Sequence, residues 1–135
     1  MIVIDASVVI EVLLQTDDGV AIAGRLLESE RTLHAPHLLD VEVAQVLRRY
    51  VARGELYEER AWQALDVLAV FPVTRYAHEP LLERIWALRE NLTAYDAAYV
   101  ALAEGLRATL FTRDRHLATV APVYTLGFDG CRGRP

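Results

Sequence analysis

The sequence opens with Met1-Ile2-Val3-Ile4-Asp5-Ala6-Ser7, and this stretch decides the fold. The run from Met1 to Ile4 is apolar and rich in β-branched residues, which predicts a short strand that is buried on both faces. Asp5 follows at the carboxyl end of that strand. Ser7 is a residue type that caps helices, so we expect it to begin a helix here. The stretch therefore predicts the first strand and helix of an α/β fold, with a carboxylate between them.

The rest of the chain continues this alternation. Further strands are expected near residues 32–35, 71–74, 108–111 and 123–125. Helices are expected over residues 17–30, 37–53, 58–70, 79–91, 94–104 and 114–119. Proline at the helix starts and glycine at their ends support these bounds, as at Pro36, Gly54 and Gly105. Alternating strands and helices predict an α/β domain with a mainly parallel sheet, whose ligands bind at the carboxyl ends of the strands.

Length and composition are those of one globular domain. The chain has 135 residues, of which 53% are hydrophobic and 24% are charged. We expect one domain over residues 1–128 and a flexible tail over 129–135, which holds the only cysteine, Cys131. A single cysteine cannot form an intrachain disulfide, so a cytoplasmic location is expected. No signal peptide or membrane span is evident.

The charged residues exclude several classes of phosphate enzyme. The net charge is −5, and every one of the 14 basic residues is arginine. Without lysine the chain cannot be a P-loop protein or a receiver domain. A dehalogenase-like phosphatase requires a second aspartate two places after the first, where this chain has Ser7. A dinucleotide-binding domain requires a glycine-rich turn after the first strand, and that turn is absent.

Four carboxylates are the candidate functional groups: Asp5, Glu42, Asp96 and Asp114. Asp5 and Asp114 each follow a predicted strand, so they project at the same sheet edge if both strands are parallel and central. Asp96 lies in the first turn of the helix that begins after Thr93. Glu42 stands in the middle of the apolar stripe of the helix over 37–53, whereas Asp40 points the opposite way and is expected to be solvated.

Each carboxylate also has a purely structural interpretation. Asp5 could help to cap the next helix, Asp96 could belong to a capping box, and Asp114 could cap a short helix. Glu42 could pair with an arginine such as Arg113. A lone carboxylate on a buried face costs several kcal/mol, roughly, unless it is paired or bound to metal.

Taken together, the four carboxylates point to a hard cation. Carboxylates that converge at one sheet edge repel each other and raise each other's pKa, and a bound cation removes that cost. Oxygen ligands suit Mg²⁺ or Mn²⁺, and the chain lacks the Cys and His spacing that zinc requires. One or two such ions could activate water and stabilise the leaving oxygen of a phosphodiester.

At these residues the sequence resembles the PIN-domain ribonucleases, and most closely the VapC-type toxins of toxin–antitoxin pairs. Four segments carry the resemblance, in the order and at the spacing of the family, and together they span the chain to about Phe128. They are Val3-Ile4-Asp5-Ala6-Ser7, Ala35-Pro36 with residues 42–49, Tyr95-Asp96 with residues 97–103, and Leu110-Phe111-Thr112-Arg113-Asp114 with residues 115–118.

The resemblance implies a five-stranded parallel sheet between helices, in three α/β/α layers. It implies that Asp5, Glu42, Asp96 and Asp114 form the metal site of a Mg²⁺- or Mn²⁺-dependent endoribonuclease. Ser7 and Thr112 match the small hydroxyl positions beside that site. The resemblance also implies a homodimer that is inhibited by a cognate antitoxin. Gln45 stands where the family often has asparagine, which leaves its role open.

Several other residues keep two interpretations. Arg113 could contact phosphate or neutralise neighbouring acids. Arg48, Arg49 and Arg53 are interpreted as a solvated helix end, and Trp62 and Trp86 as core or interface residues rather than base-stacking residues. Tyr95 and Tyr99 are interpreted in the same way, with base stacking left open by their position near Asp96.

Two hypotheses at the level of the whole protein follow. Apolar surface on the helices around residues 20–27 and 38–50 is expected to bind a partner protein. A catalytically inactive PIN-fold binding module is the alternative to a nuclease, and it would need no Mg²⁺.

Overall fold

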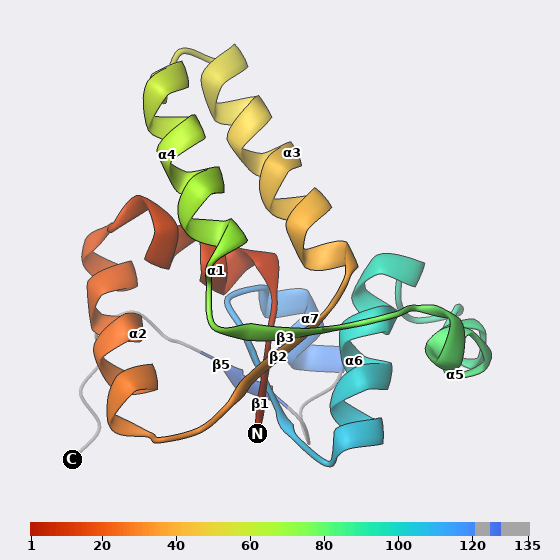
Figure 1. The fold of residues 1–135 in the computed structure, drawn as a ribbon. Coiled ribbons are helices and arrows are strands. Elements are labelled where there is room, and N and C mark those ends of the chain that lie inside the picture. The colour runs from red at the N-terminus through yellow and green to blue at the C-terminus, as the bar shows by residue number, and fades with distance from the viewer. Residues whose placement is uncertain (121–124, 128–135) are drawn as a thin grey trace.

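A five-stranded parallel sheet forms the centre of the molecule in the computed structural model, which describes residues 1–120 and 125–127 (Figure 1). The strands are β1 (Ile2–Ile4), β2 (Leu33–Pro36), β3 (Val73–Tyr76), β4 (Thr109–Thr112) and β5 (Thr125–Gly127). Their spatial order is β3-β2-β1-β4-β5, and every neighbouring pair is parallel. The expected five-stranded parallel sheet is confirmed.

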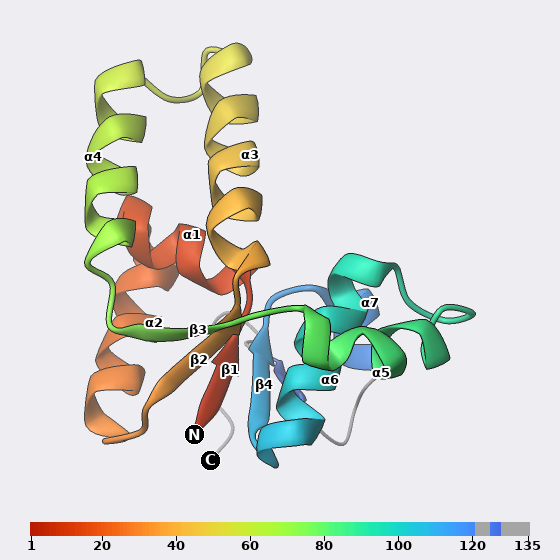
Figure 2. The same ribbon diagram turned by 45° about the vertical axis from the view of Figure 1, so that its right-hand side comes forward.

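Helices cover both faces of the sheet, which gives the expected three layers (Figure 2). They are α1 (Ala6–Leu14), α2 (Asp17–Glu28), α3 (Leu38–Ala52), α4 (Glu58–Ala69), α5 (Leu82–Ala87), α6 (Ala94–Leu106) and α7 (Arg115–Val120). A 3-10 turn, η1 (Glu79–Leu81), precedes α5. Helices α1 to α4 pack on one face, and α5, α6 and α7 pack on the other.

The side chains of β1 alternate between the two cores. Ile2 and Ile4 belong to the core beneath α1 to α4, together with Val43 of α3. Val3 belongs to the opposite core, together with Tyr99 of α6. Because successive residues of a strand point to opposite faces, three apolar residues in a row are what a strand covered on both faces requires.

The order of the strands reverses beside β1. From β1 the chain proceeds outward through β2 and β3, and it then returns to β4 on the other side of β1. Neighbouring connections therefore leave β1 and β4 in opposite directions, which opens a crevice at their carboxyl ends. Asp5 follows β1 and Asp114 follows β4 at this point. The topology thus brings together two acids that lie 109 positions apart in the sequence.

Helices α3 and α4 form an antiparallel hairpin that extends beyond the body of the domain (Figures 1 and 2). Leu39 and Val43, near the start of α3, are fully buried. Further along, Leu47 of α3 packs in the same core as Ala64 and Leu68 of α4. One side of the lower part of α3 therefore faces the carboxyl ends of the strands.

Several expected bounds and caps are corrected by the structure. Asp5, not Ser7, is the N-cap of α1, because its carboxylate accepts a hydrogen bond from the backbone of Val8. The helix expected over 79–91 becomes η1 and α5, and it ends at Ala87. Gly105 does not end α6, which closes instead on Arg107 in the left-handed conformation.

One edge strand is displaced from its expected position, because β3 begins at Val73 rather than at Phe71. β5 spans Thr125–Gly127, two residues beyond the expected end at residue 125, and residues 123–124 lie outside the described residues. Residues 121–124 and 128–135, including Cys131 and the expected tail, lie outside the described residues. Within the described ranges, no helix has the length and hydrophobicity that crossing a membrane requires.

Candidate active site

All four predicted acids line one cleft of about 460 Å³ at the carboxyl ends of β1 and β4. Asp5 comes from the end of β1, and Glu42 from the second turn of α3. Asp96 comes from the first turn of α6, and Asp114 from the loop after β4. The structure therefore brings together four side chains from four different elements, as the sequence predicts.

Asp5 is buried at the floor of the cleft, where hydrogen bonds fix both of its carboxylate oxygens. Its Oδ1 accepts from the Ser7 hydroxyl at 2.6 Å and from the backbone N–H of Val8 at 3.2 Å. Its Oδ2 accepts from the Thr112 hydroxyl. The carboxylate plane is therefore set by one hydroxyl on each side. Oδ1 accepts two hydrogen bonds, whereas Oδ2 accepts one and keeps a lone pair for a further ligand.

Backbone amides of the loop after β4 hold these two hydroxyls in place. The N–H of Arg113 donates to Ser7 Oγ at 2.9 Å, and the N–H of Asp114 donates to Thr112 Oγ1 at 3.0 Å. Each hydroxyl thus accepts from this loop and donates its own proton to Asp5. This chain of bonds ties the ends of β1 and β4 together, which explains why small hydroxyl residues suit both positions.

Burial raises the pKa of Asp5 to about 6. Desolvation is the main cause, because it penalises the charged form, and the negative charge of Glu42 adds to it. The hydrogen bonds from Ser7, Thr112 and Val8 oppose the shift. Asp5 is therefore a carboxylate that gains strongly from a nearby positive charge.

Glu42 is held by a tyrosine and not by an arginine. The Tyr99 hydroxyl of α6 donates to Glu42 Oε1 at 2.6 Å. Tyr99 is only 2% exposed, and both desolvation and the Glu42 charge raise its pKa, so it remains a protonated donor. The pKa of Glu42 is itself raised by burial and by the charge of Asp96, against the effect of the Tyr99 hydrogen bond.

The two remaining acids both line the cleft, and each lies at the N-terminus of a helix. The Thr93 hydroxyl caps α6 by accepting from the Asp96 backbone N–H at 3.2 Å. Burial and the charge of Asp114 raise the pKa of the Asp96 side chain. Asp114 Oδ1 accepts from the N–H groups of His116 and Leu117, which caps α7. The structural interpretations of Asp5 and Asp114 as caps are thus correct, and both still line the cleft.

Arg113 does not neutralise the cleft. Its guanidinium pairs with Glu11 at 3.1 Å and with Asp18 at 2.7 Å, on α1 and α2. Asp18 reaches it because α2 lies very close to α1, where any Cβ at Gly19 would stand 1.9 Å from the Glu11 carbonyl oxygen. The expected pairing of Glu42 with Arg113 is therefore wrong. Arg113 instead neutralises two nearby acids outside the cleft, Glu11 and Asp18.

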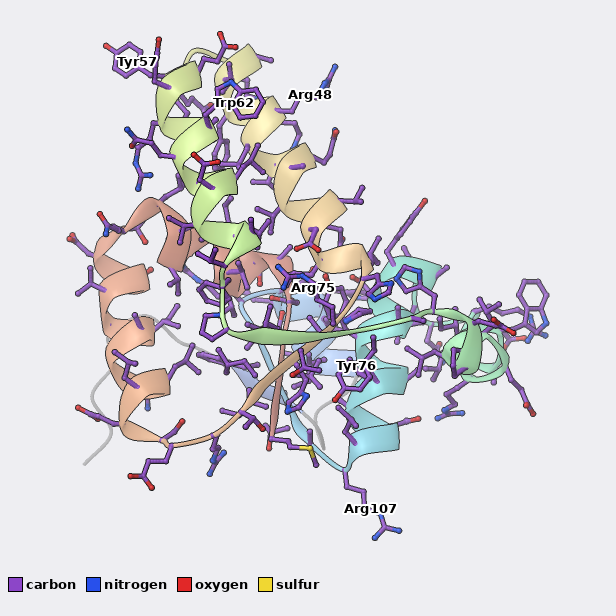
Figure 3. The ribbon with its side chains drawn as sticks, in the orientation of Figure 1. Arg48, Tyr57, Trp62, Arg75, Tyr76 and Arg107 are labelled. Atoms are coloured by element: carbon purple, nitrogen blue, oxygen red, sulfur yellow. The ribbon has the colours of Figure 1, made fainter. Side chains whose placement is uncertain are left out.

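The expectation for Asp40 is corrected by the structure. Asp40 is not simply solvated, because Arg75 of β3 binds both of its oxygens at 2.8 to 3.0 Å; Arg75 is labelled in Figure 3. Trp62 and Trp86 were expected in the core or at an interface, and their high exposure leaves the interface interpretation.

Two hydrogen bonds that support Glu42 and the start of α3 were not predicted from the sequence. The first is the bond from Tyr99 to Glu42, because nothing in the sequence around Tyr99 beyond its position near Asp96 indicates this partner. The ring of His78 accepts from the backbone N–H of Leu38 at 2.9 Å, in place of a side-chain cap from α3 itself.

The donor set has the chemistry of a hard-cation site. Four carboxylates, three of them with a raised pKa, line the cleft, and none of the four forms an ion pair with an arginine that the structure describes. Within residues 1–120 and 125–127, no three Asp, Glu, His or Cys side chains are arranged to hold one ion as they stand. The oxygen ligands thus fit Mg²⁺ or Mn²⁺ in type, and coordination would be completed by water and small side-chain movements.

Comparison with known proteins identifies the family. The PIN domain family matches residues 2–122 of the chain. The VapC ribonuclease Mb0985 of Mycobacterium bovis is 48% identical over 118 residues, which cover 87% of this chain and 89% of that protein. Ribonuclease VapC1 of Mycobacterium tuberculosis is 47% identical over 117 residues, which cover 86% and 87%.

Two solved structures share the fold. PAE2754 from Pyrobaculum aerophilum has a TM-score of 0.70 at 26% identity, and the match covers 92% of this chain and 81% of that one. VapC20 of Mycobacterium tuberculosis, a toxin that cleaves the sarcin-ricin loop, has a TM-score of 0.67 at 16% identity, with coverage of 89% and 95%. The second likeness concerns the fold alone. The chain therefore belongs to the PIN-domain family and, within it, to the VapC ribonucleases.

Proposed function

We propose that this protein is an endoribonuclease that acts as the toxin of a toxin–antitoxin pair. In this proposal Asp5, Glu42, Asp96 and Asp114 hold Mg²⁺ or Mn²⁺ and form the site that hydrolyses an RNA phosphodiester. The ribonuclease names of relatives that are nearly half identical over most of the chain support the activity. The cleft at the carboxyl ends of β1 and β4 supports the site.

One observation carries the assignment of the site. Four carboxylates from four elements share a cleft, and the pKa of three of them is raised by burial and, in each case, by a neighbouring carboxylate. Such an arrangement destabilises the empty protein, so it is expected where a cation is bound for function. The arginine that could have cancelled this charge, Arg113, is paired elsewhere.

The chain's own residues orient the ligands. A bound Mg²⁺ or Mn²⁺ would supply an activated water and offset the charge that develops on the leaving oxygen. Ser7 and Thr112 fix the plane of Asp5 from either side. Tyr99 fixes Glu42 through one oxygen and leaves the other available. Partners of this kind, which orient metal ligands without touching the metal, are worth about 10- to 100-fold in metal affinity or activity.

Two partners belong to the same proposal: a cognate antitoxin and a second copy of this chain. The supporting observation is exposed apolar surface on helices around residues 20–27 and 38–50. Leu27 is 81% exposed, and Val20 and Val41 are also largely exposed. Val20 and Leu27 lie on α2 and Val41 lies on α3, so they mark two separate exposed apolar regions. Exposed apolar surface is typical of partner surfaces. We further propose that the protein acts in the cytoplasm, where its RNA substrate is found.

The experiment is cleavage of total cellular RNA by the purified full-length chain in Mg²⁺, in Mn²⁺ and in EDTA. We expect endonucleolytic products with either metal and none in EDTA. Asp5→Asn is the inactive control, and Asp66→Asn, an exposed aspartate on α4, is the matched control outside the cleft. Cleavage that survives EDTA or Asp5→Asn would refute the metal site, and no cleavage under any condition would favour the non-catalytic binding module.

A further inference from the structure

The cleft has a rim beyond its four acids, and two side chains of that rim have no role in the fold. Arg49 of α3 and Tyr95 of α6 both line the cleft. Arg49 follows Glu42 by seven residues, which places it about two helical turns, or about 10 Å, further along the same stripe of α3. Tyr95 immediately precedes Asp96. The two residues thus lie on different helices beside the acids.

Arg49 is the one basic residue among those that line the cleft in the described part of the chain. Its side chain is exposed and forms no hydrogen bond or ion pair with any described residue. Other arginines differ: Arg75 binds Asp40, Arg113 binds Glu11 and Asp18, and Arg60 donates to the Leu13 carbonyl. Arg49 therefore keeps its full capacity to bind a ligand.

Tyr95 is an exposed aromatic ring next to a buried one. It is 63% exposed, whereas Tyr99, one turn later on α6, is 2% exposed and bonded to Glu42. A flat ring at the mouth of an acidic cleft gains nothing from the core. It can, however, stack on an unpaired base, because every base offers a π-face.

Electrostatics favour such a rim. The chain carries a net charge of −5, and the cleft itself is lined by four carboxylates. An RNA strand therefore gains no attraction from the protein as a whole, and a local cation is required to hold its phosphates. Arginine suits this task because its planar guanidinium can bind two phosphate oxygens at once.

We propose that Arg49 and Tyr95 form the substrate-binding rim of this enzyme. Arg49 binds a phosphate that neighbours the scissile one, and Tyr95 stacks on an unpaired base beside the cut. Such stacking requires an unpaired base, because a base inside a duplex cannot reach the Tyr95 ring. This inference rests on the proposed ribonuclease activity and names the residues that select its substrate.

The chain offers matched controls for both residues. Arg48 directly precedes Arg49 on α3 and is also exposed, but it is not among the residues that line the cleft. Its side chain extends outward from the hairpin (Figure 3). Tyr57 is an exposed tyrosine at the far tip of the hairpin (Figure 3). If Arg49 merely solvates a helix end, it will behave like Arg48.

The experiment measures kcat, KM and their salt dependence on a fluorescein-labelled RNA oligonucleotide that carries the segment cut by the wild type in total RNA. Arg49→Gln should raise KM about 10-fold while kcat changes little, and it should reduce the slope of log(kcat/KM) against log[salt] by about 1. Arg48→Gln should change neither quantity. Because both side chains are exposed, the melting temperature of each variant should match that of the wild type.

Tyr95→Ala should raise KM about 5- to 100-fold on the single strand, whereas Tyr95→Phe and Tyr57→Ala should not. Annealing the oligonucleotide to its complement should remove the difference between Tyr95→Ala and the wild type. The inference would be overturned if Arg48→Gln and Arg49→Gln had equal effects. It would also be overturned if Tyr95→Ala had the same effect on the single strand and on the duplex. In both cases the ribonuclease assignment would stand. A wild type that cuts no RNA would overturn both.

Discussion

Two hollows of nearly equal size lie at opposite ends of the parallel strands. The cleft of about 460 Å³ at the carboxyl ends is lined by four carboxylates. The second, of about 440 Å³, lies where β2 and β3 begin, and it is lined mainly by apolar residues of α1, α2 and these strand starts, such as Val12, Leu26 and Phe71. Volume alone therefore does not distinguish an active site from an apolar groove. The two are distinguished by the end of the strands at which each lies and by the chemical type of the residues that line it.

The two hollows also carry different energetic costs. The acidic cleft keeps carboxylates in a buried setting where their charged forms are disfavoured. The apolar groove leaves side chains such as Leu27 in contact with water, which favours covering by a partner. Each cost is removed by a different ligand, a cation in the first case and an apolar surface in the second. Substitutions in the two hollows should therefore have different effects, because they remove different costs.

The largest effect is expected at the floor of the acidic cleft. Asp5→Asn and Asp96→Asn should each lower the rate of RNA cleavage by more than about 100-fold, the most that loss of a supporting partner alone would cause. Circular dichroism should show an unchanged fold. Near-wild-type turnover in both variants would remove these residues from the catalytic site.

The same Asp5→Asn substitution should make the metal-free protein more stable. Burial raises the pKa of Asp5 from 3.8 to about 6, so the folded state binds this proton more tightly than the unfolded chain does. The stabilisation is full below about pH 4 and is lost as the pH rises through about 6. At neutral pH the substitution should therefore raise the free energy of unfolding by up to about 3 kcal/mol.

Urea denaturation in EDTA, followed from pH 4 to pH 8, measures this effect. The wild type should lose stability across that interval, and Asp5→Asn should lose less. Added Mn²⁺ should restore the wild type and leave the variant unchanged. A variant that is less stable than the wild type at every pH would show that the hydrogen bonds of Asp5 outweigh its burial.

A smaller effect is expected for the hydroxyls that fix Asp5. Ser7→Ala removes the donor to Asp5 Oδ1 and the acceptor for the Arg113 backbone N–H. We expect affinity for Mn²⁺, measured by titration calorimetry, to fall about 10-fold or more. Ser29→Ala, at the end of α2, is the matched control. Unchanged affinity in Ser7→Ala would assign this serine a role in folding only.

A still smaller effect is expected where α3 begins. His78→Ala leaves the Leu38 backbone N–H without its acceptor, which should cost about 1 kcal/mol of stability, as for the loss of a helix cap. Chemical denaturation measures it. His37→Ala is the control, because the side chain of His37 makes no capping hydrogen bond to α3. Equal losses in the two variants would contradict a specific capping role.

The smallest effect on cleavage is expected in the apolar groove. Leu27→Ser should change the rate of RNA cleavage by less than about two-fold, because the groove lies at the opposite end of the strands from the acids. The same variant should bind the cognate antitoxin more weakly in a pull-down with the purified partner. A large loss of cleavage would show that the two hollows are coupled.

Much of the fold follows from local patterns in the sequence. The apolar run at residues 1–4 and the alternation of elements predict the parallel sheet, and strand direction then predicts that Asp5 and Asp114 meet. Bounds were wrong where tertiary contacts override local signals. Gly105 continues α6, and residues 88–91, expected to be helical, lie beyond the end of α5.

The supports of the site could not be predicted in the same way. The bond from Tyr99 to Glu42 joins residues 57 positions apart, and that from Thr112 to Asp5 joins residues 107 apart. Such pairs depend on how helices pack over the sheet, and neither residue has a local pattern that reveals its partner. The ion pair between Arg113 and Asp18 was equally hidden in the sequence. It forms where Gly19 lets α2 lie close against α1.

The most direct test of the metal site is the anomalous diffraction of a crystal of this protein soaked in Mn²⁺. We expect an anomalous peak in the cleft, within about 2.5 Å of carboxylate oxygens of Asp5 and of at least one other acid of the four. A fully soaked crystal with no peak in this cleft, or with its only peak elsewhere, would contradict the claim that these four carboxylates hold the metal.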